Sequence, residues 1–558
     1  MNRLSADYAD LRGTAHRRLK KLTLKSAEIC VIFGLVLLGF ALTACSSDNP
    51  TTTEETPTEI EQTPQGIQYG GHLRVGYSLE PTSLDAVLGR SGGDAYYWHQ
   101  IYDQLVDANI DLTPKLSTSL AESWEVTTDP DAITFKLRGG VKFHDGTPFN
   151  ADAVKKNIER ILDPATKATP RASMTVIESV DVIDDLTVRF NLKRPWGAGF
   201  NMLADRGGVM NSPEKILQLG RDYGWQPAGT GPFKVNEVIM GTYVHLVRNE
   251  DYWAKDEFGN RLPYLDEVTI RVIREQTVLA AALRTGEIDV AYLPYKDVAA
   301  FQRDDRFQIE TMDGGGITLV LVFNVDKPPM DDLNLRLAIS HAVNPAIINK
   351  AIFFDRVAVA DSGMWPTGAW AHDPTVERPH YDLEKARAYL AKSKYADNAT
   401  FTTVTNNSPT LIPSAEIIRV MLKKLGITMN IEVLHAGAAT EDFFHGQQYP
   451  MYMTAWSRYP EPDWLASLAY KSDGYYNPGN VSRPDVDQMV ELGASYYSIE
   501  ERTPVYHKLN ALVLQEAWYV PMLYSVNYAA APQKIQNLER LMGWDGKMFL
   551  RDIWIKRQ

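Results

Sequence analysis

The stretch AITFKLRGGVKFHDGTPFNADAVKKNIERIL, residues 132–162, decides the fold class of this chain. Its first half alternates apolar and polar side chains around the turn dipeptides GG and DG, and this pattern predicts a β-hairpin. Its second half spaces apolar residues along one helical face and begins at Asn150, whose side chain is suited to cap a helix start. A strand pattern that passes directly into a helix pattern predicts an α/β fold.

The chain beyond residue 70 continues this mixture, without a fixed-period repeat or a second apolar run long enough to span a membrane. Alternation predicts strands at HLRVGYSL (72–79), LTVRFNL (186–192), TMNIEVL (428–434) and YPMYMTAW (449–456). Helical spacing predicts amphipathic helices at DLNLRLAISHAVNPAIINKAIF (332–353) and DLEKARAYLAKS (382–393).

Length and charge narrow the class of protein. A chain of 558 residues exceeds what one core usually holds, so we expect two or three domains. Its 57 Lys and Arg against 70 Asp and Glu give a net charge of −13. This balance argues against nucleic acid as a main partner, because phosphate binding needs a basic surface, although a local basic pocket for an anion stays open.

Both cysteines, Cys30 and Cys45, lie in or beside the first apolar run, so residues 46–558 contain none. The folded part therefore has no disulfide framework, thiolate metal site or thiol nucleophile. The histidines considered as ligands lack the i, i+4 helical pair of a zinc site, and we expect no structural metal. They are His341, His372, His380, His435 and His445.

The N-terminal segment has the layout of a secretory signal. A basic stretch, HRRLKKLTLK (16–25), precedes an uncharged run over residues 29–44, which as a helix would be about 24 Å long and shorter than a bilayer core of about 30 Å. The run ends in LTAC (42–45), which resembles a bacterial lipobox. We therefore predict a signal peptide over residues 1–44 and lipidation of Cys45; the alternative is an uncleaved signal anchor with an incidental cysteine.

The segment after Cys45 is rich in Thr, Glu and Pro and almost free of large apolar residues. Such a composition buries too little surface to offset its ordering entropy. We predict that residues 45–69 form a flexible tether between the lipid anchor and the folded body.

Eight segments, in one order along the mature chain, resemble the peptide/nickel/opine-type extracellular solute-binding proteins that serve ABC importers. Four segments from the first half are GGHLRVGYSLEPTSLDAV (70–87), the stretch 101–162, LADRGGVMNSPEKI (203–216) and GTGPFKVNEV (229–238). The other four are LRTGEIDVAYLP (283–294), FNVDKPPMDDLNLRLAISHAVN (323–344), YDLEKARAYLAKS (381–393) and AWSRYPEPDW (455–464).

The resemblance implies a two-lobed, periplasmic-binding-protein-like clamshell with an extra inserted domain. Lobe I is expected to be discontinuous, and lobe II continuous. The expected boundaries are 70–103, 220–322 and 522–558 for lobe I, 104–219 for the inserted domain, and 323–521 for lobe II.

The resemblance also implies a function. A peptide or peptide-like small solute would bind between the lobes, and closure would present it to an ABC permease with separate ATPase subunits. Oligopeptides, glutathione-like or opine-like compounds and metal chelates all stay open as cargo. The implied protein is a monomeric binding protein rather than an enzyme, without a cofactor, held outside the cytoplasmic membrane in the periplasm or at the cell surface. A clamshell that serves a membrane sensor or acts as a chaperone is an alternative.

The loop WSRYPEPD (456–463) combines a large aromatic, a cation, two acids and two prolines after a predicted strand. In the family the matching loop crosses the cleft; otherwise it is a proline-rich surface loop. Peptide binders carry an aspartate soon after the Trp, which pairs with the peptide amine, and this chain has Arg and Tyr there instead. That departure favours an anionic ligand but leaves the two acids able to meet a cation. The candidates are Trp456, Ser457, Arg458, Tyr459, Glu461 and Asp463.

Further candidates come from other segments. Arg206 has a guanidinium suited to a carboxylate or phosphate, and the alternative is an ion pair with Asp205 or another acid. Glu80 follows the first strand and is expected to face the cleft. The aromatic residues are interpreted as pocket walls or as core, and Asn324 as part of the hinge. These aromatics are Tyr96, Tyr97, Trp98, Tyr475 and Tyr476, with Asn477 beside them.

The segment GRSGG (89–93) matches the G-x-S-x-G pattern of serine hydrolases. That motif needs a strand leading into a helix and suitably placed Asp and His partners. Here it follows a predicted loop, so a secreted hydrolase acting through Ser91 is the weaker alternative, and we expect no catalytic residue.

Overall fold

The structure, a computed structural model, describes residues 63–89, 92–109, 113–312, 317–376, 378–457, 461–543 and 545–557. All of them belong to the unit Ile60–Gln558. The predicted signal peptide, Cys45 and most of the tether lie outside the described residues, as do Ser91, Arg458 and Tyr459. In the part of the chain that is described, no helix combines the length and apolar character needed to cross a membrane.

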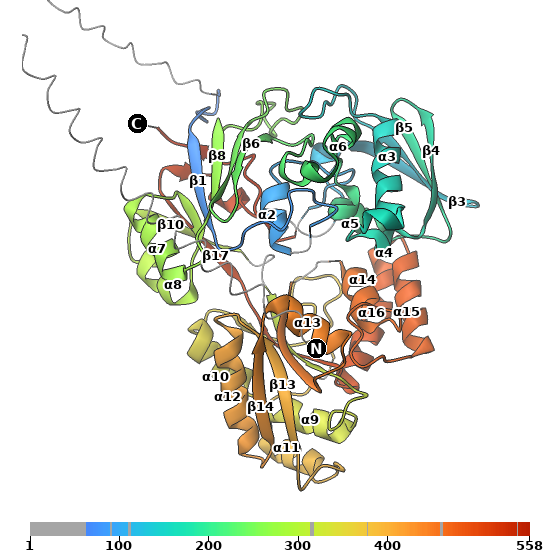
Figure 1. Cartoon of the computed structure of the whole chain (residues 1–558), viewed down its shortest axis with the longest axis vertical. Coiled ribbons are helices and arrows are strands. Elements are labelled where there is room, and N and C mark those ends of the chain that lie inside the picture. The colour runs from blue at the N-terminus through green and yellow to red at the C-terminus, as the bar shows by residue number, and fades with distance from the viewer. Residues whose placement is uncertain are drawn as a thin grey trace, which may run out of the picture. The chain divides into compact units, whose positions relative to one another are not determined.

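Seven strands form the first sheet (Figure 1). Its central strand β1 (His72–Tyr77) runs parallel to β8 (Glu267–Val272) and β9 (Val290–Tyr292), so three carboxyl ends share one edge; the other pairings are antiparallel. Helices α7 (Gln276–Thr285) and α8 (Tyr295–Gln302) pack on one part of this sheet. The strand order is β10 (Phe307–Met312), β17 (Asn527–Pro532), β9, β1, β8, β7 (Tyr243–Arg248) and β6 (Phe233–Ile239).

A second, antiparallel sheet has four strands within residues 121–192. Helix α3 (Ala151–Leu162) packs on it, and its predicted cap is confirmed: Asn150 accepts a hydrogen bond from the Ala153 N–H at 3.0 Å. The strand order is β2 (Ala121–Thr128), β3 (Asp131–Leu137), β5 (Thr187–Leu192) and β4 (Ile177–Asp184). The short helices α4 (Arg171–Met174), α5 (Gly199–Ala204) and α6 (Pro213–Leu219) complete this region.

The hairpin predicted over residues 132–149 is wrong in its pairing. Strand β3 has β2 on one edge and β5 on the other, so no edge is left for the segment that follows it. That segment forms a small loop closed by one bridge between Lys142 and Pro148, around the predicted DG turn. Alternation identified the strand and the turn, but the partner was set by tertiary packing.

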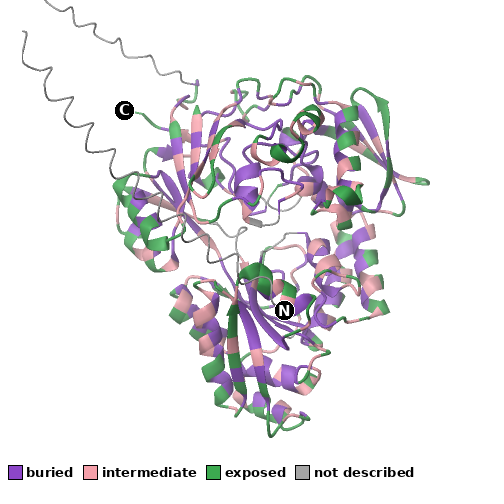
Figure 2. Ribbon diagram, in the orientation of Figure 1, coloured by how far each residue is buried: buried purple, intermediate pink, exposed green. Residues whose placement is uncertain are grey.

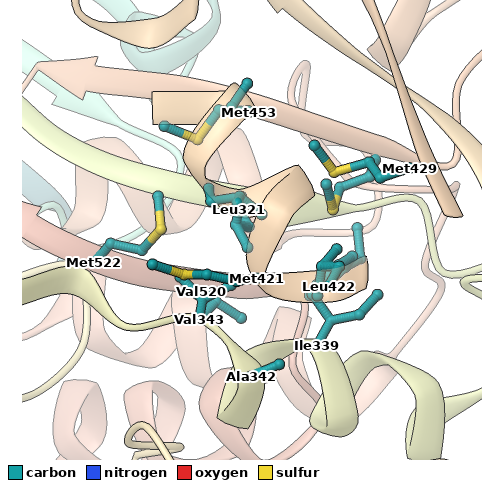
Figure 3. Close-up of a cluster of buried hydrophobic side chains, with 14 of the residues drawn as sticks. Leu321, Ile339, Ala342, Val343, Met421, Leu422, Met429, Met453, Val520 and Met522 are labelled. Atoms are coloured by element: carbon teal, nitrogen blue, oxygen red, sulfur yellow. The ribbon is translucent and has the colours of Figure 1, made fainter. Parts of the chain in front are cut away.

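The third sheet has six strands within residues 317–524. Its core contains Leu321, Ile339, Met453 and Met522, which lie together between strands and helices in Figure 3. In Figure 2 its inner strands are largely buried, whereas the edge strands and the helices around the sheet carry the exposed residues. The order is β12 (Ala358–Val359), β16 (Tyr519–Tyr524), β11 (Ile317–Phe323), β15 (Met451–Ser457), β13 (Thr400–Asn406) and β14 (Thr428–Leu434). The accompanying helices include α11 (Leu383–Leu390), α12 (Leu411–Lys423), α13 (Ala436–Phe444), α14 (Pro462–Leu465), α15 (Pro484–Ser495) and α16 (Ile499–Gln515).

The four predicted strand segments are confirmed as β1, β5, β14 and β15, and the helix predicted at 382–393 as α11. The helix predicted over residues 332–353 is split into α9 (Leu333–Ala342) and α10 (Pro345–Ile348). Pro345 supplies no N–H and disfavours helical backbone in the residue before it. Asn344 is extended there and caps the new start by accepting from the Ala346 N–H at 3.1 Å.

The chain passes between the first and third sheets at two neighbouring places, from β10 to β11 and from β16 to β17. Both strand pairs are antiparallel, and Ile317 and Ser525 exchange hydrogen bonds at 2.7 and 2.8 Å where they meet. We call this paired connection the crossing. Asn324 does not belong to it, because Asn324 follows the opposite end of β11, where its N–H donates to Pro450 O at 2.9 Å. The predicted domain boundaries stay predictions.

Candidate functional site

A pocket of 440 Å³ lies beside the crossing, and we call it the crossing pocket. It opens where β1 and β9 end, the edge at which α/β sheets commonly bind ligands. The starts of β11 and β17 contribute the wall on the side of the crossing. Its lining includes Tyr77, Tyr96, Tyr292, Ile317, Asn527 and Lys547.

Tyrosines form the main surface of the crossing pocket. The rings of Tyr77 and Tyr96 stack with centroids 4.2 Å apart, and Tyr292 meets Tyr96 edge-on at 5.6 Å. Burial raises the pKa of all three phenols, so they are neutral at physiological pH. Lys547, whose Nζ lies 6.0 Å from the centroid of the Tyr96 ring, is the only charged side chain among the described lining residues. The pocket thus offers aromatic surface and one cation.

Two predicted residues, Tyr97 and Glu80, do not line this pocket. Tyr97 is fully buried and donates its hydroxyl to the carbonyl of Leu79, itself a lining residue, at 2.6 Å. Glu80 is partly exposed and forms an ion pair with Arg274 at 3.0 Å. Of the predicted aromatic group 96–98, only Tyr96 lines the pocket, while Tyr97 and Trp98 belong to the core.

Arg206 begins a short 3-10 turn after α5 and supports a neighbouring segment of the first lobe. Its Nη1 donates to the carbonyl of Gly89 at 2.6 Å, an oxygen that also accepts from Thr169 at 2.8 Å. Burial raises the pKa of the Asp205 carboxyl, and the charge of Arg206 acts in the opposite direction. Arg206 therefore interacts electrostatically with Asp205, as the ion-pair alternative expected, while an anionic ligand for Arg206 stays a prediction.

The end of β15 lies beside the start of β11 at the crossing pocket. Ser457 pairs with the lining residue Ile317, and Trp456 pairs with Thr318 on the neighbouring strand. Trp456 is nearly buried and meets Tyr476 edge-on with ring centroids 4.8 Å apart. Its Nε1–H has no hydrogen-bond partner within the described part of the chain. A buried N–H without a partner costs free energy, and Trp456 itself lines neither this pocket nor the next.

A second pocket, of 590 Å³, lies between the four-stranded-sheet region and helices of the six-stranded-sheet lobe. We call it the interdomain pocket. Arg194 and Trp196 line one side, and Asp463 and Ser467 line the other. The predicted residues Tyr475 and Asn477 also line it. It therefore carries charges of both signs, unlike the crossing pocket.

The two acids of the predicted loop have different environments. Glu461 is buried in an ion pair with Arg502, whose Nη1 lies 3.1 Å away, and it also accepts from Asn201 of α5 at 2.5 Å. Its carboxylate is occupied by these partners, and it lines neither pocket. For Asp463, burial together with the charge of Glu461 raises the pKa to about 6. The structure therefore gives Glu461 a role in holding the two regions together, and its ligand role is a prediction without support here.

Sequence reasoning missed Tyr292, Lys547 and Arg194. Tyr292 ends a short strand, so its position at the ligand-binding edge was available from the pattern VAYLP in principle. Lys547 follows a DG turn near the C-terminus and Arg194 follows β5, and nothing in their local sequence distinguishes them from surface cations.

Comparison with known proteins adds the following. The sequence model for "Bacterial extracellular solute-binding proteins, family 5 Middle" matches residues 115–477. The glutathione-binding protein GsiB of Escherichia coli strain K12 is 30% identical over 459 residues, which cover 80% of this chain and 86% of that protein.

Solved structures show the same two-lobed fold, at sequence identities of 22–24%. The binding protein DppA of Helicobacter pylori, in complex with the peptide STSA, superposes with a TM-score of 0.77 at 24% identity, covering 88% of this chain and 99% of its own. NikA of Brucella suis, in complex with Fe(III)-EDTA, gives 0.77 at 22% identity over 87% of this chain and 100% of its own. The predicted periplasmic-binding-protein-like fold is thereby confirmed.

Proposed function

The chain belongs to family 5 of the bacterial extracellular solute-binding proteins, and from this premise we propose that it captures a peptide or peptide-like small solute in the crossing pocket and delivers it to the permease of an ABC importer. The observation that carries the proposal is the convergence at this pocket of strand ends from both lobes. β1 and β9 end at it, and β11 begins there beside the end of β15. A solute bound here touches both lobes, so its binding energy favours the closed arrangement.

The lining of the crossing pocket indicates the chemistry of the solute. Its volume of 440 Å³ lies within the range of about 300–1,000 Å³ found for small-molecule sites. Neutral tyrosines offer apolar surface, and Lys547 offers a positive charge to a carboxylate. A solute that joins apolar groups to a carboxylate, such as a short or modified peptide, fits these features.

We further propose that Cys45 carries a lipid and holds the protein as a monomer outside the cytoplasmic membrane, near a permease and its ATPase subunits. The LTAC end of the apolar run and the tether-like composition after it support this anchoring. The relatives compared are binding proteins, which supports solute capture without catalysis.

Native mass spectrometry of the protein as purified tests the proposal, because it identifies the carried solute and shows whether that solute is released intact. With the solute known, Tyr77→Phe should weaken its affinity about 2- to 12-fold, the equivalent of one lost neutral hydrogen bond, because Tyr77 lines the crossing pocket. Stability should change little, since phenylalanine keeps the ring of Tyr77 that stacks on Tyr96. Tyr470→Phe is the matched control, because Tyr470 is a buried tyrosine that lines neither pocket.

A second variant tests the cation. Lys547→Met should weaken a carboxylate-bearing solute about 10- to 100-fold by calorimetry, the usual range for a charged hydrogen bond. Lys296→Met is the control, because Lys296 is exposed next to the lining residue Tyr295. The proposal is overturned if no small solute binds, or if one binds with an affinity that neither pocket variant changes.

A further inference from the structure

Three metal-ligating side chains lie together on the first sheet, outside both pockets. They are His72 on β1, His245 on β7 and Glu267 on β8. His72 and Glu267 stand at the beginnings of their strands, whereas the crossing pocket lies at the carboxyl end of β1. All three side chains reach solvent, with exposed fractions of 43%, 20% and 44%.

Strand pairing brings them onto one face. β1 and β8 run parallel with His72 opposite Glu267, and β7 runs antiparallel to β8 with His245 opposite Thr269. Side chains two residues apart on a strand share a face, so His245 lies diagonally across from Glu267. The intervening residues Leu73 and Val268 are buried on the other face of the sheet.

The two distances from Glu267 to the histidines are close to those of a tetrahedral zinc centre. Oε2 of Glu267 lies 3.6 Å from Nδ1 of His72 and 3.2 Å from Nε2 of His245, and one ligand atom from each residue lies within 4.8 Å of the others. Zinc bonds of about 2.0–2.2 Å in tetrahedral geometry separate neighbouring ligand atoms by about 3.4 Å. Small rotations of exposed side chains are enough to reach this value.

The remaining nitrogen of each imidazole has a polar neighbour, as is usual for metal-binding histidines. Nε2 of His72 lies 2.8 Å from the hydroxyl of Thr269, which can accept its proton. Nδ1 of His245 lies 3.1 Å from the side-chain amide of Asn236, which can present its oxygen on turning over. These contacts leave Nδ1 of His72 and Nε2 of His245 to face Glu267.

We propose that His72, His245 and Glu267 form a zinc site with three protein ligands and a fourth position for water. The ion would join β1, β8 and β7, and so stabilise one part of the seven-stranded sheet. The site is independent of the solute, because its ligands lie in neither pocket.

Calorimetric titration of the chelator-treated full-length protein with Zn²⁺ tests this site. We expect saturable binding at one strong site, an affinity reduced at least 10-fold by His72→Ala and by His245→Ala, and a similar loss in Glu267→Gln, which keeps the side-chain shape. His435→Ala is the matched control, because His435 is exposed and lies outside the cluster. Zinc should also raise the thermal unfolding midpoint of the wild type and of this control, but not of the three ligand variants.

Zinc-free unfolding midpoints of the variants show that they are folded, so that a lost affinity reports on the ligand. The proposal is overturned if the wild type shows no saturable zinc binding, or if the three ligand variants bind zinc as tightly as His435→Ala does. Saturation with the solute should leave zinc binding unchanged.

Discussion

The crossing pocket and the interdomain pocket lie between elements that are far apart in sequence, but they bury different groups. The first is lined by stacked tyrosines and one lysine, and its surface carries no acid among the described lining residues. The second borders a buried ion pair, Glu461 with Arg502, and a further buried acid, Asp463.

A substitution in the crossing pocket would therefore disturb ligand contacts, whereas one at the interdomain pocket would disturb buried charges. Tyrosines keep their neutral form when buried, so a pocket built from them stays intact with or without a ligand. A buried carboxylate lowers stability unless it is paired with a partner. Asp463 lies beside Glu461, and the nearby cation, Arg502, is already paired with Glu461. We therefore expect substitutions near the interdomain pocket to change stability, and those in the crossing pocket to change affinity.

Arg502→Met should have the largest effect on stability near the interdomain pocket. The guanidinium is almost fully buried against Glu461, and its loss leaves a buried carboxylate without its cation. We expect the free energy of unfolding to fall by about 3–5 kcal/mol, measured by urea denaturation. Arg419→Met is the control, because Arg419 pairs with Glu416 on an exposed helix face and should change stability by less than about 0.5 kcal/mol. A loss below about 1 kcal/mol in Arg502→Met would contradict the buried pair.

Asp463→Asn tests the difference between the two pockets through the pH dependence of the free energy of unfolding. The pKa of Asp463 is raised from 3.8 to about 6 in the folded chain, so between these values the folded state holds a proton that the unfolded state releases. The free energy of unfolding of the wild type therefore falls as pH rises from about 4 to 6, and the cost persists above pH 6. Two pKa units correspond to about 3 kcal/mol. We expect Asp463→Asn to be more stable than the wild type by up to about 3 kcal/mol at pH 7.5, and equally stable below pH 4.

Asp473→Asn serves as the control for this experiment, because Asp473 lines the same pocket but its side chain is 77% exposed. Its stability should follow that of the wild type at every pH. If Asp463→Asn shows the same pH dependence as the wild type, the raised pKa is not a property of this carboxyl.

Gly197→Ala tests the contact beside the interdomain pocket. A Cβ on Gly197 would lie 1.6 Å from the carbonyl oxygen of Tyr496, where the backbones of the two regions also join through the Ala198 N–H and Ala494 O at 3.1 Å. We expect the free energy of unfolding to fall by about 1–3 kcal/mol, with weaker solute binding, because the regions must separate to admit the methyl group.

Gly437→Ala is the matched control for that substitution. It lies in α13, where the nearest atom to an added Cβ is 3.9 Å away, so alanine should stabilise the chain by about 0.5–1 kcal/mol. A Gly197→Ala protein as stable as the wild type would show that the two backbones do not touch in solution.

Local signals predicted much of the fold. The cap at Asn150, strand β15 and helix α11 all depend on residues within a few positions of one another. The partner of β3 did not follow from its sequence, because the choice between a hairpin and a sheet depends on which edges other strands occupy. Pro345 is itself a helix-breaking signal. One continuous helix was nevertheless predicted, because the helical spacing of apolar residues continues on both sides of Pro345.

The candidate site was predictable only in part for the same reason. Trp456 and Asp463 were found because they lie at or after the end of a clear strand, but only Asp463 lines a pocket. The role of Glu461 depends on Arg502, 41 positions away, and its preference for that partner has no local signature. The cluster of His72, His245 and Glu267 was missed because a search for helical spacing cannot detect ligands contributed by three strands.

The crossing described above also bears on the entropy of solute capture. Two chain connections, tied together by the exchange between Ile317 and Ser525, restrict the relative orientation of the lobes more than a single connection would. We therefore expect the solute-free protein to sample fewer lobe orientations than one whose lobes are joined once. Binding then removes little orientational freedom, so more of the contact energy in a small pocket is retained as affinity.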